Sequence, residues 1–257
     1  MAVRWQKQDR GIAVITLDEP EARNAFTAEA RSELRDALGA LGDDPEVDAL
    51  VITGAGGHFC AGGDIRTMGE TDTAVIIERM GDVAKTAEMV AAFPKPVICA
   101  VAGHVAGAGI SLACLADMVI AEETAQFTFS FLRIGLGPDW GLSFTLPRRV
   151  GATTAKRLIV TATSIDAEEA HRLGLVDVVT LENEALGTAL GAARDLAGGP
   201  KESIAAIKGM LTDMEGLRAA LALEADMQRQ RFPAWEHQEG AAAFREKRKP
   251  DFTKGGV

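Results

Sequence analysis

A repeated order of apolar strand, glycine-rich turn and helical segment constrains the fold of this chain most. GIAVITL (11–17), DALVITG (48–54) and PVICAVAG (96–103) are apolar, β-rich stretches, and the last two end in glycine. Residues 27–41 place their apolar side chains on one face of a helix. Strands that alternate with helices predict a mostly parallel sheet with helical crossovers. Ligand sites in such folds gather where the strands end.

From about residue 152 the pattern becomes mainly helical. Asp166 and Glu169 have the spacing of a capping box, and Gly174 is expected to end that helix. A brief strand, LVDVV (175–179), follows, and Gly198-Gly199-Pro200 breaks the chain before a final helical stretch. We therefore predict an α/β core over residues 1–195 and a helical C-terminal subdomain over residues 196–257.

The composition excludes several classes of protein. With 47% hydrophobic and 25% charged residues in 257, the chain is expected to be globular. Its formal charge of −10 argues against nucleic acid or an anionic membrane as a partner. No apolar run reaches the roughly 20 residues that cross a bilayer, and the N-terminus does not resemble a signal peptide. These features predict a cytoplasmic protein.

Metal, disulfide and nucleotide chemistry find little support in the sequence. The cysteines Cys60, Cys99 and Cys114 are odd in number and lie in small or apolar surroundings, which favours reduced, buried thiols. The four histidines lack the spacing of metal ligands, so we expect no metal site. P-loop, dinucleotide-binding and nucleophile-elbow motifs are also missing.

Two glycine-rich turns are the candidates for chemistry. They are ITGAGGHFCAGGDI (52–65) and VAGHVAGAGISLACLAD (101–117). Small residues let the backbone approach a ligand and expose its N–H groups, and a helix N-terminus adds positive partial charge. Such turns also occur where they serve only to let helices and strands pack, and each turn alone leaves both interpretations open.

Taken in order, these segments resemble the crotonase, or enoyl-CoA hydratase/isomerase, superfamily over essentially the whole chain. The segments that carry the resemblance are RNAF (23–26), VITGAGGHFCAGGDI (51–65), KPVICAVAGHVAGAGISLACLADMVIAEETAQF (95–127), LGPDWGLSFTLPRRVG (136–151), AEEAHRLGLVD (168–177) and AAFREKRKPDF (242–252). The resemblance implies a spiral of ββα units with a C-terminal helical region. It also implies assembly into a homotrimer or a dimer of trimers.

Members of this family bind an acyl-CoA thioester and hold its carbonyl oxygen with two backbone N–H groups. By position, the resemblance places these donors on Gly63 in the AGGD turn and on Ala108 at the start of a helix. Two preorganised amides stabilise an enolate more than the ground-state thioester. No separate cofactor is expected, because coenzyme A is part of the substrate.

The resemblance also implies contacts to the substrate. Arg66 and Arg23 correspond to positions near the CoA phosphates and adenosine, and Phe244 and Lys247 to positions that cover the nucleotide from a neighbouring subunit. The full set that we expect to line the site is Arg23, Ala25, Ala61, Asp64, Ile65, Arg66, Ser111, Phe131, Trp140, Phe244 and Lys247. The basic stretch around Lys247 can alternatively be a solvated tail.

Departures from the family pattern bear on the reaction. Hydratases of this family use two glutamates, and Ser111 and Phe131 occupy those positions here. Neither side chain is an effective base. Asp139, in GLGPDWG, matches an aspartate of dienoyl-CoA and ring-1,2-epoxyphenylacetyl-CoA isomerases, although an aspartate in such a turn can simply cap its own backbone.

The leading hypothesis is therefore an enoyl-CoA isomerase in which Asp139 moves a proton between carbons. The double-bond shift and the formation of an oxepin from an epoxyphenylacetyl-CoA are both reactions of this kind. Two alternatives remain, namely an enoyl-CoA hydratase and a CoA-ester-binding subunit without turnover.

Overall fold

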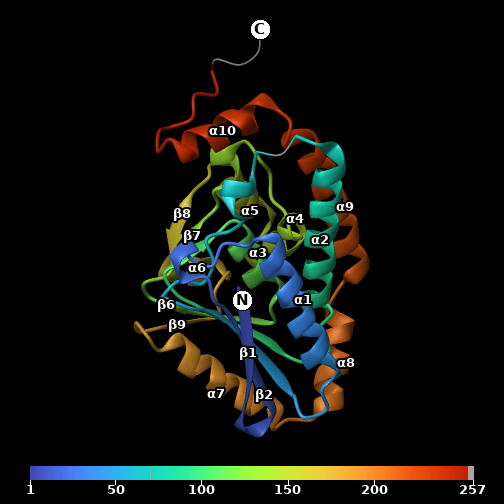
Figure 1. Ribbon diagram of the computed structural model, residues 1–257. Coiled ribbons are helices and arrows are strands. Elements are labelled where there is room, and N and C mark those ends of the chain that lie inside the picture. Colours follow the sequence, from blue (N-terminus) through green and yellow to red (C-terminus); the bar gives the residue numbers. More distant parts are fainter. Residues whose placement is uncertain (70, 254–257) are drawn as a thin grey trace.

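A computed structural model describes residues 1–69 and 71–253, whose strands form two sheets (Figure 1). The strands are β1 (Val3–Gln8), β2 (Ile12–Leu17), β3 (Ala49–Gly54), β4 (Val97–Val101), β5 (His104–Ala106), β6 (Met118–Glu122), β7 (Gln126–Thr128), β8 (Ser164–Asp166) and β9 (Val178–Thr180). The α-helices are α1 (Ala28–Asp43), α2 (Thr73–Ala91), α3 (Ala108–Leu115), α4 (Leu142–Val150), α5 (Ala152–Val160), α6 (Ala167–Leu173), α7 (Ala185–Ala197), α8 (Lys201–Leu211), α9 (Met214–Arg231) and α10 (Trp235–Arg245). Short 3-10 helices are η1 (Asp9–Gly11), η2 (Pro20–Ala22), η3 (Ile65–Thr67) and η4 (Phe131–Ile134).

The larger sheet has the strand order β1-β2-β3-β4-β6-β9. β1 and β2 form an antiparallel hairpin, whereas the strands from β2 to β9 are parallel. Parallel neighbours need long crossovers, which explains why a helix follows most strands. Every residue of β2 and β4 is buried, as is typical of strands that are covered on both faces.

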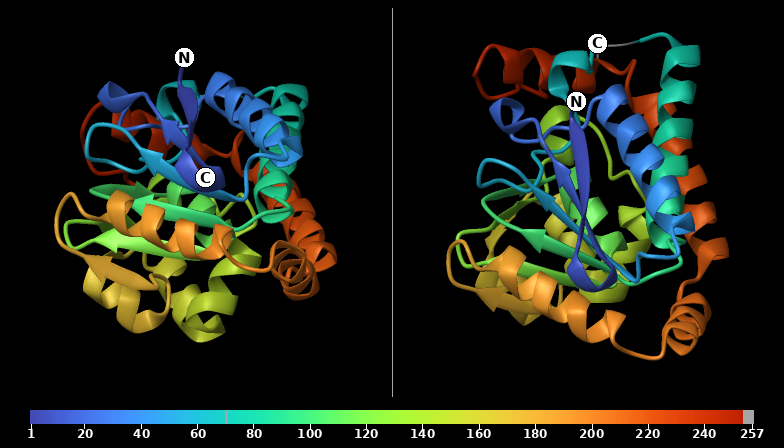
Figure 2. Two further views of the ribbon diagram at one scale, coloured as in Figure 1. Left: turned by 90° about the horizontal axis from the view of Figure 1, so that it is seen from below. Right: turned by 60° about the horizontal axis from the view of Figure 1, so that its bottom comes forward.

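Helix α7 covers one face of this sheet, as both views in Figure 2 show. Its buried residues recur every four positions and are all alanine, namely Ala185, Ala189, Ala193 and Ala197. They pack against residues of β2, β3, β4 and β6, including Ile12, Val51 and Ile98. Small side chains on one stripe let the helix lie close to the sheet.

Helices α1, α2 and α9 lie side by side along the molecule (Figure 1). Their apolar faces join the main core, to which α1 contributes Leu34, Leu38 and Leu41. An ion pair of 2.7 Å between Arg218 Nε and Glu88 Oε2 links α9 to α2. The helical C-terminal region therefore packs directly on the α/β core.

The small sheet forms a second layer that positions the glycine turns. β5 follows β4 and pairs in parallel with β7, which pairs antiparallel with β8. Isolated bridges from Cys60 to Val105 and from Phe26 to Gly63 extend this layer toward the early loop. The turn at residues 61–63 is thus fixed between two other segments of the chain.

Most of the elements expected from the sequence are confirmed. β2, α1, β3 and β4 fall on the predicted stretches, and helices α8, α9 and α10 occupy the final region. The strand expected at 175–179 is wrong in position, because the paired residues are Val178–Thr180. The predicted boundary between residues 195 and 196 falls inside α7.

The cap expected at α6 forms in part. The side chain of Asp166 accepts a hydrogen bond of 2.8 Å from the Glu169 N–H, and Gly174 ends the helix in the left-handed region. The Glu169 carboxylate instead binds Arg172, one turn further along, at 2.6 Å. In a complete capping box the Glu169 carboxylate would accept a hydrogen bond from the Asp166 N–H, and here the ion pair with Arg172 takes the place of that bond.

Asp117 holds α8 to the sheet, and we predict that Asp117→Asn lowers the free energy of unfolding by about 1–3 kcal/mol. Its carboxylate accepts hydrogen bonds from Val97 N–H at 2.7 Å and from Lys208 Nζ at 2.6 Å. Lys208 is largely buried and would keep a charge without its counter-ion. Urea denaturation measures the change, and Asp195→Asn on the exposed side of α7 is the control. Equal stability of the two variants would contradict this role.

Candidate functional site

The two glycine turns predicted from the sequence meet in the structure. A β-carbon on Gly62 would lie 3.6 Å from the Ala108 nitrogen, and one on Gly107 would lie 3.8 Å from the Gly62 Cα. Both glycines have positive φ, 98° for Gly62 and 48° for Gly107, which L side chains rarely adopt. Conformation therefore favours glycine at both positions, and space also favours it at Gly62, where a β-carbon would lie 3.0 Å from the Ala106 carbonyl oxygen.

Two backbone amides in these turns lack internal partners. Neither Gly63 N–H nor Ala108 N–H donates a hydrogen bond to any residue in the described ranges. Ala108 is also the first residue of α3, where the helix dipole contributes positive partial charge. Ala108 is buried and Gly63 is half-buried, and unpaired amides at buried positions such as Ala108 are rare in proteins. These two amides can donate hydrogen bonds to an anionic or polarised oxygen of a ligand.

Asp139 supplies a carboxylate in the loop between η4 and α4. Its Oδ1 is buried and has no hydrogen-bond partner among the described residues. Burial, followed by the negative charge of Glu224, raises the pKa of Asp139 to about 7, although the nearby Arg79 and Arg31 act in the opposite direction. A carboxylate with such a pKa can both take and return a proton near neutral pH.

Backbone contacts close the turn that contains Asp139. The Leu142 N–H donates to the main-chain oxygen of Asp139 at 3.2 Å, so this contact does not use the carboxylate. Trp140 has φ of 58°, in the left-handed region, and is 2% exposed. Its ring lies 4.7 Å from that of Phe26, the residue bridged to Gly63. These contacts connect the Asp139 loop to the glycine turn.

Helix α9 holds the same loop through two polar side chains that the sequence did not reveal. Glu224 accepts hydrogen bonds from Gly141 N–H at 2.7 Å and Ser143 N–H at 2.8 Å, and Gln228 donates to the Gly137 carbonyl at 2.9 Å. Both side chains are buried together with Leu217 and Leu221. In the sequence, Glu224 and Gln228 continue the helical spacing of Leu217 and Leu221, and this spacing is the signal that could have predicted their burial.

The positions of the expected glutamates have other roles. The Ser111 hydroxyl is buried and donates to the Gly107 carbonyl at 3.3 Å, so it satisfies a carbonyl at the start of α3. Phe131 is buried, and its ring lies 3.9 Å from the β-carbon position of Gly107. Neither position therefore supplies a carboxylate to this side of the turns.

Arg23 and Ala25 belong to an early loop that is joined to the AGGD turn through Ala61, the first residue of that turn. The Ala61 N–H donates to the Arg23 carbonyl at 2.9 Å, and the Arg23 side chain is exposed. Asn24, which was not among the predicted site residues, fixes this loop through hydrogen bonds to the carbonyls of Ala55 and His58 at 2.9 and 2.7 Å. Its side chain therefore has a structural role.

Asp64, Ile65 and Arg66 lie at the start of η3. The Asp64 carboxylate accepts from the Arg66 N–H at 3.0 Å and binds the guanidinium through Nε at 2.9 Å and Nη2 at 3.1 Å. Asp64 is buried, whereas the Arg66 side chain is exposed. Ile65 is half-buried beside the main core. In this structure Asp64 caps the turn and orients Arg66.

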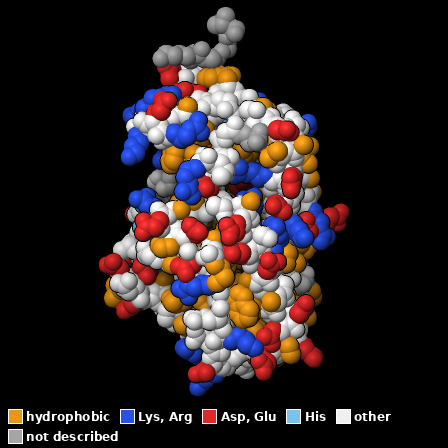
Figure 3. All heavy atoms as spheres, in the orientation of Figure 1, with side chains coloured by type: hydrophobic (Ala, Val, Ile, Leu, Met, Phe, Trp, Pro, Cys, Tyr) orange, Lys and Arg blue, Asp and Glu red, His pale blue; other side chains and the backbone are white. Residues whose placement is uncertain are grey.

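Phe244 and Lys247 lie at the end of α10 and are exposed. Figure 3 shows basic side chains gathered over this end of the molecule. Arg248, also in this stretch, is neutralised by Glu239 and by Glu246. Lys254, a further member of the basic stretch, lies outside the described residues. The Arg245 Nη1 is 3.9 Å from the β-carbon position of Gly69, so α10 ends close to the loop after η3.

The described residues hold no cluster of histidine, cysteine, aspartate and glutamate that could bind a metal ion. Cys60, Cys99 and Cys114 are buried free thiols, and burial raises the pKa of each above its usual range. Within the same ranges, every helix is too short or too polar to cross a membrane.

Comparisons with known proteins identify the family to which the chain belongs. The family model described as enoyl-CoA hydratase/isomerase matches residues 7–255. The chain is 36% identical over 253 residues to a 1,2-epoxyphenylacetyl-CoA isomerase of Escherichia coli, with 95% of this chain and 96% of that protein covered. It is 37% identical to a crotonyl-CoA hydratase of Syntrophomonas wolfei, with 96% of each covered.

Solved structures show the same similarity in three dimensions. A crystal structure of an enoyl-CoA hydratase from Mycobacterium avium subsp. paratuberculosis superposes with a TM-score of 0.89 at 30% identity, covering 99% of both chains. The ββα units and the C-terminal helical region are those of the crotonase fold. The chain therefore belongs to the enoyl-CoA hydratase/isomerase family.

Proposed function

We propose that this protein is an acyl-CoA isomerase that stores a thioester enolate on two backbone amides and moves a proton with Asp139. The observation that carries the proposal is the buried Asp139 carboxylate, whose Oδ1 has no partner in the described part of the chain. Its raised pKa supports action as both base and acid.

The proposed reaction has two proton transfers. The thioester oxygen accepts hydrogen bonds from the N–H groups of Gly63 and Ala108, each worth about 3 kcal/mol in the transition state. The Asp139 carboxylate removes an acidified C–H proton, which leaves the electron pair delocalised into the enolate. The protonated Asp139 then returns this proton to another carbon, so the substrate keeps its mass and the enzyme is regenerated.

The absence of carboxylates at positions 111 and 131 supports isomerisation over hydration. Hydration needs one group to deprotonate water and a second to deliver a proton to the α-carbon. Ser111 is bound to a helix carbonyl, and Phe131 is apolar. Hydratase activity remains the alternative because relatives with hydratase names are as similar as the isomerase.

The chain is proposed to bind CoA through Arg23, Arg66, Phe244 and Lys247, and to assemble as a homotrimer or a dimer of trimers. Exposed apolar side chains on α8 and α9 support an assembly face, since Met210, Leu211 and Leu223 are 77%, 81% and 73% exposed. In such an assembly Phe244 and Lys247 would cover the nucleotide of a neighbouring subunit.

The reaction can be identified by incubating the protein with 3-enoyl-CoA, 2-enoyl-CoA and an epoxyphenylacetyl-CoA. We expect at least one of these esters to change its ultraviolet absorbance without a change in mass. Addition of one water to 2-enoyl-CoA at about 10 per second or faster would support the hydratase alternative. Binding of all three without conversion would instead indicate a protein without turnover.

Asp139→Asn is expected to lower kcat of the isomerisation by 100-fold or more, with little change in CoA-ester binding. The amide keeps the size of the side chain but cannot accept the proton. In the wild-type protein, kcat/KM should rise with pH up to about 7, because the base must be ionised. A variant that retains most of its activity would contradict the assignment of Asp139.

Stability provides the control for this variant. The pKa of Asp139 is higher in the folded protein than its unfolded value of about 4. The folded state then binds more protons between these values, so this group costs stability as the pH rises from about 4 to 7. Asp139→Asn should therefore be at least as stable as the wild type at pH 8, which separates a lost base from misfolding.

Lys247→Glu is expected to weaken binding of CoA esters by a similar factor for different acyl groups. The substitution reverses a charge near the proposed phosphate site, so its effect should decrease as salt is added. Isothermal titration calorimetry at low and high salt measures this change. Lys156→Glu, which alters an exposed lysine on α5, is the matched control, and equal affinities for the two variants would indicate a solvated tail.

A further inference from the structure

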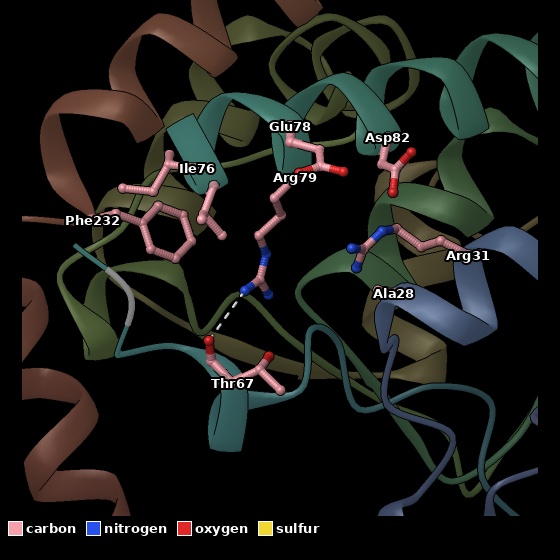
Figure 4. Close-up of a pocket in the computed structure, with 9 residues that line it drawn as sticks. Ala28, Arg31, Thr67, Ile76, Glu78, Arg79, Asp82 and Phe232 are labelled. Carbon is pink, nitrogen blue, oxygen red and sulfur yellow. Dashed lines mark hydrogen bonds between the residues drawn. The ribbon is translucent and has the colours of Figure 1, made fainter. Parts of the chain in front are cut away.

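A pocket of about 300 Å³ lies beside the proposed acyl-CoA site, between α1, α2 and η3 (Figure 4). Arg31 from α1 and Arg79 from α2 point into the same space, and Ile76 and Phe232 form an apolar side. None of these residues has been given a role in the proposed proton transfer. The pocket therefore raises the question of which group it accepts.

Arg31 is a buried cation that forms no ion pair among the described residues, although the charges of Asp82 and Asp139 act on it and favour its protonated form. Its residue is 5% exposed, and its side chain makes no hydrogen bond or ion pair with any described residue. Burial, and then the like charge of Arg79, lower the pKa of Arg31 to about 10. Arginine remains protonated at neutral pH in such a site. A buried guanidinium of this kind is costly unless an anion joins it.

The guanidinium of Arg79 also has few hydrogen-bond partners among the described residues. Its Nη1 donates to the Thr67 carbonyl at a long 3.4 Å, and its guanidinium lies 5.3 Å from the centre of the Phe232 ring. It forms no ion pair with a carboxylate in the described part of the chain. Most of its five N–H donors thus remain available to a ligand.

The acidic residues around the pocket form no ion pair with either arginine in the described ranges, although Asp82 and Asp139 act electrostatically on Arg31, and Asp139 and Asp64 act on Arg79. Asp82 pairs with Arg35 at 3.3 Å, and Arg35 also donates to the Asp82 carbonyl and the Thr86 hydroxyl. Glu78 is exposed at the edge of the pocket (Figure 4). Both acids lie on α2, and Figure 4 shows the Asp82 carboxylate on the Arg31 side of the pocket.

The pocket adjoins the proposed reaction site. Arg79 Nη2 lies 3.7 Å from the β-carbon position of Gly63, one of the two proposed oxyanion donors. Both arginines also act electrostatically on Asp139. An acyl group whose thioester oxygen is bound at Gly63 would therefore extend past Arg79 within a few bonds.

We infer that Arg31 and Arg79 bind a second carboxylate on the acyl group, so that the substrate class is the CoA monoester of a short dicarboxylic acid. This inference rests on the proposed acyl-CoA function. Two guanidinium forks can each offer paired N–H donors to the two oxygens of a carboxylate. With an uncharged acyl tail, neither cation would form an ion pair in the described part of the chain, and Asp139 would be the carboxylate that acts on both.

The test compares saturated CoA esters, which cannot be isomerised, by isothermal titration calorimetry. Glutaryl-CoA is paired with valeryl-CoA, and adipyl-CoA with hexanoyl-CoA, so that each pair differs in the terminal group alone. The wild-type protein should bind the carboxylate member of at least one pair about tenfold more tightly, as expected for charge-assisted hydrogen bonds. Arg31→Met and Arg79→Met should each lose this preference while binding the neutral ester normally. Arg218→Met, which removes an exposed arginine from α9, should retain it.

Each outcome separates this inference from the proposed function. Equal affinity for both members of both pairs would overturn the inference and leave acyl-CoA binding intact. Preference that survives both substitutions, or equal loss of the neutral and charged esters, would also overturn it, because the arginines would then tune Asp139 or support the fold. Failure of the wild-type protein to bind any ester would contradict the proposed function and the inference together.

Discussion

The carboxylate of Glu224 fixes the loop that carries Asp139, and the proposed chemistry depends on this interaction. It accepts hydrogen bonds from the Gly141 and Ser143 N–H groups at the start of α4, where a helix dipole favours negative charge. The same charge helps to raise the pKa of Asp139. One buried side chain of α9 therefore both positions the loop and adjusts its base. The helical C-terminal region is in this way part of the site on the α/β core.

Opposing charges set the protonation of Asp139. Burial and Glu224 favour its neutral form, whereas Arg79 and Arg31 favour the ionised form, and burial is the largest effect. A substrate carboxylate between the arginines would offset their positive charge. The pKa of Asp139 would then rise on binding, which would make the ionised carboxylate a stronger base toward a carbon acid. Substrate recognition and base strength would be coupled through the same two guanidinium groups.

The features that the sequence predicted are local or strongly patterned. The strands around residues 11–17 and 48–54 are short apolar runs, and the glycine turns are recognisable by their high content of glycine. Glu224, Gln228 and Arg31 could not be assigned in this way. Glu224 meets Gly141 across 83 residues of sequence, and Arg31 becomes buried where helices stack. Pattern within one helix predicts which face is apolar, but it does not say which polar side chain a distant segment will cover.

The surroundings of the two unpaired amides favour chemistry that needs a single mobile proton. The Ser111 hydroxyl donates a hydrogen bond to the Gly107 carbonyl, and the buried Phe131 ring lies near Gly107. Neither side chain is placed to activate a water molecule, because the Ser111 hydroxyl is already bound to a carbonyl and the Phe131 ring has no proton to transfer. The enolate carbon would thus meet the Asp139 acid more readily than an activated water. In the proposed reaction the two non-acidic side chains and the single aspartate act together, because positions 111 and 131 hold no second carboxylate to activate water while Asp139 carries the proton from carbon to carbon.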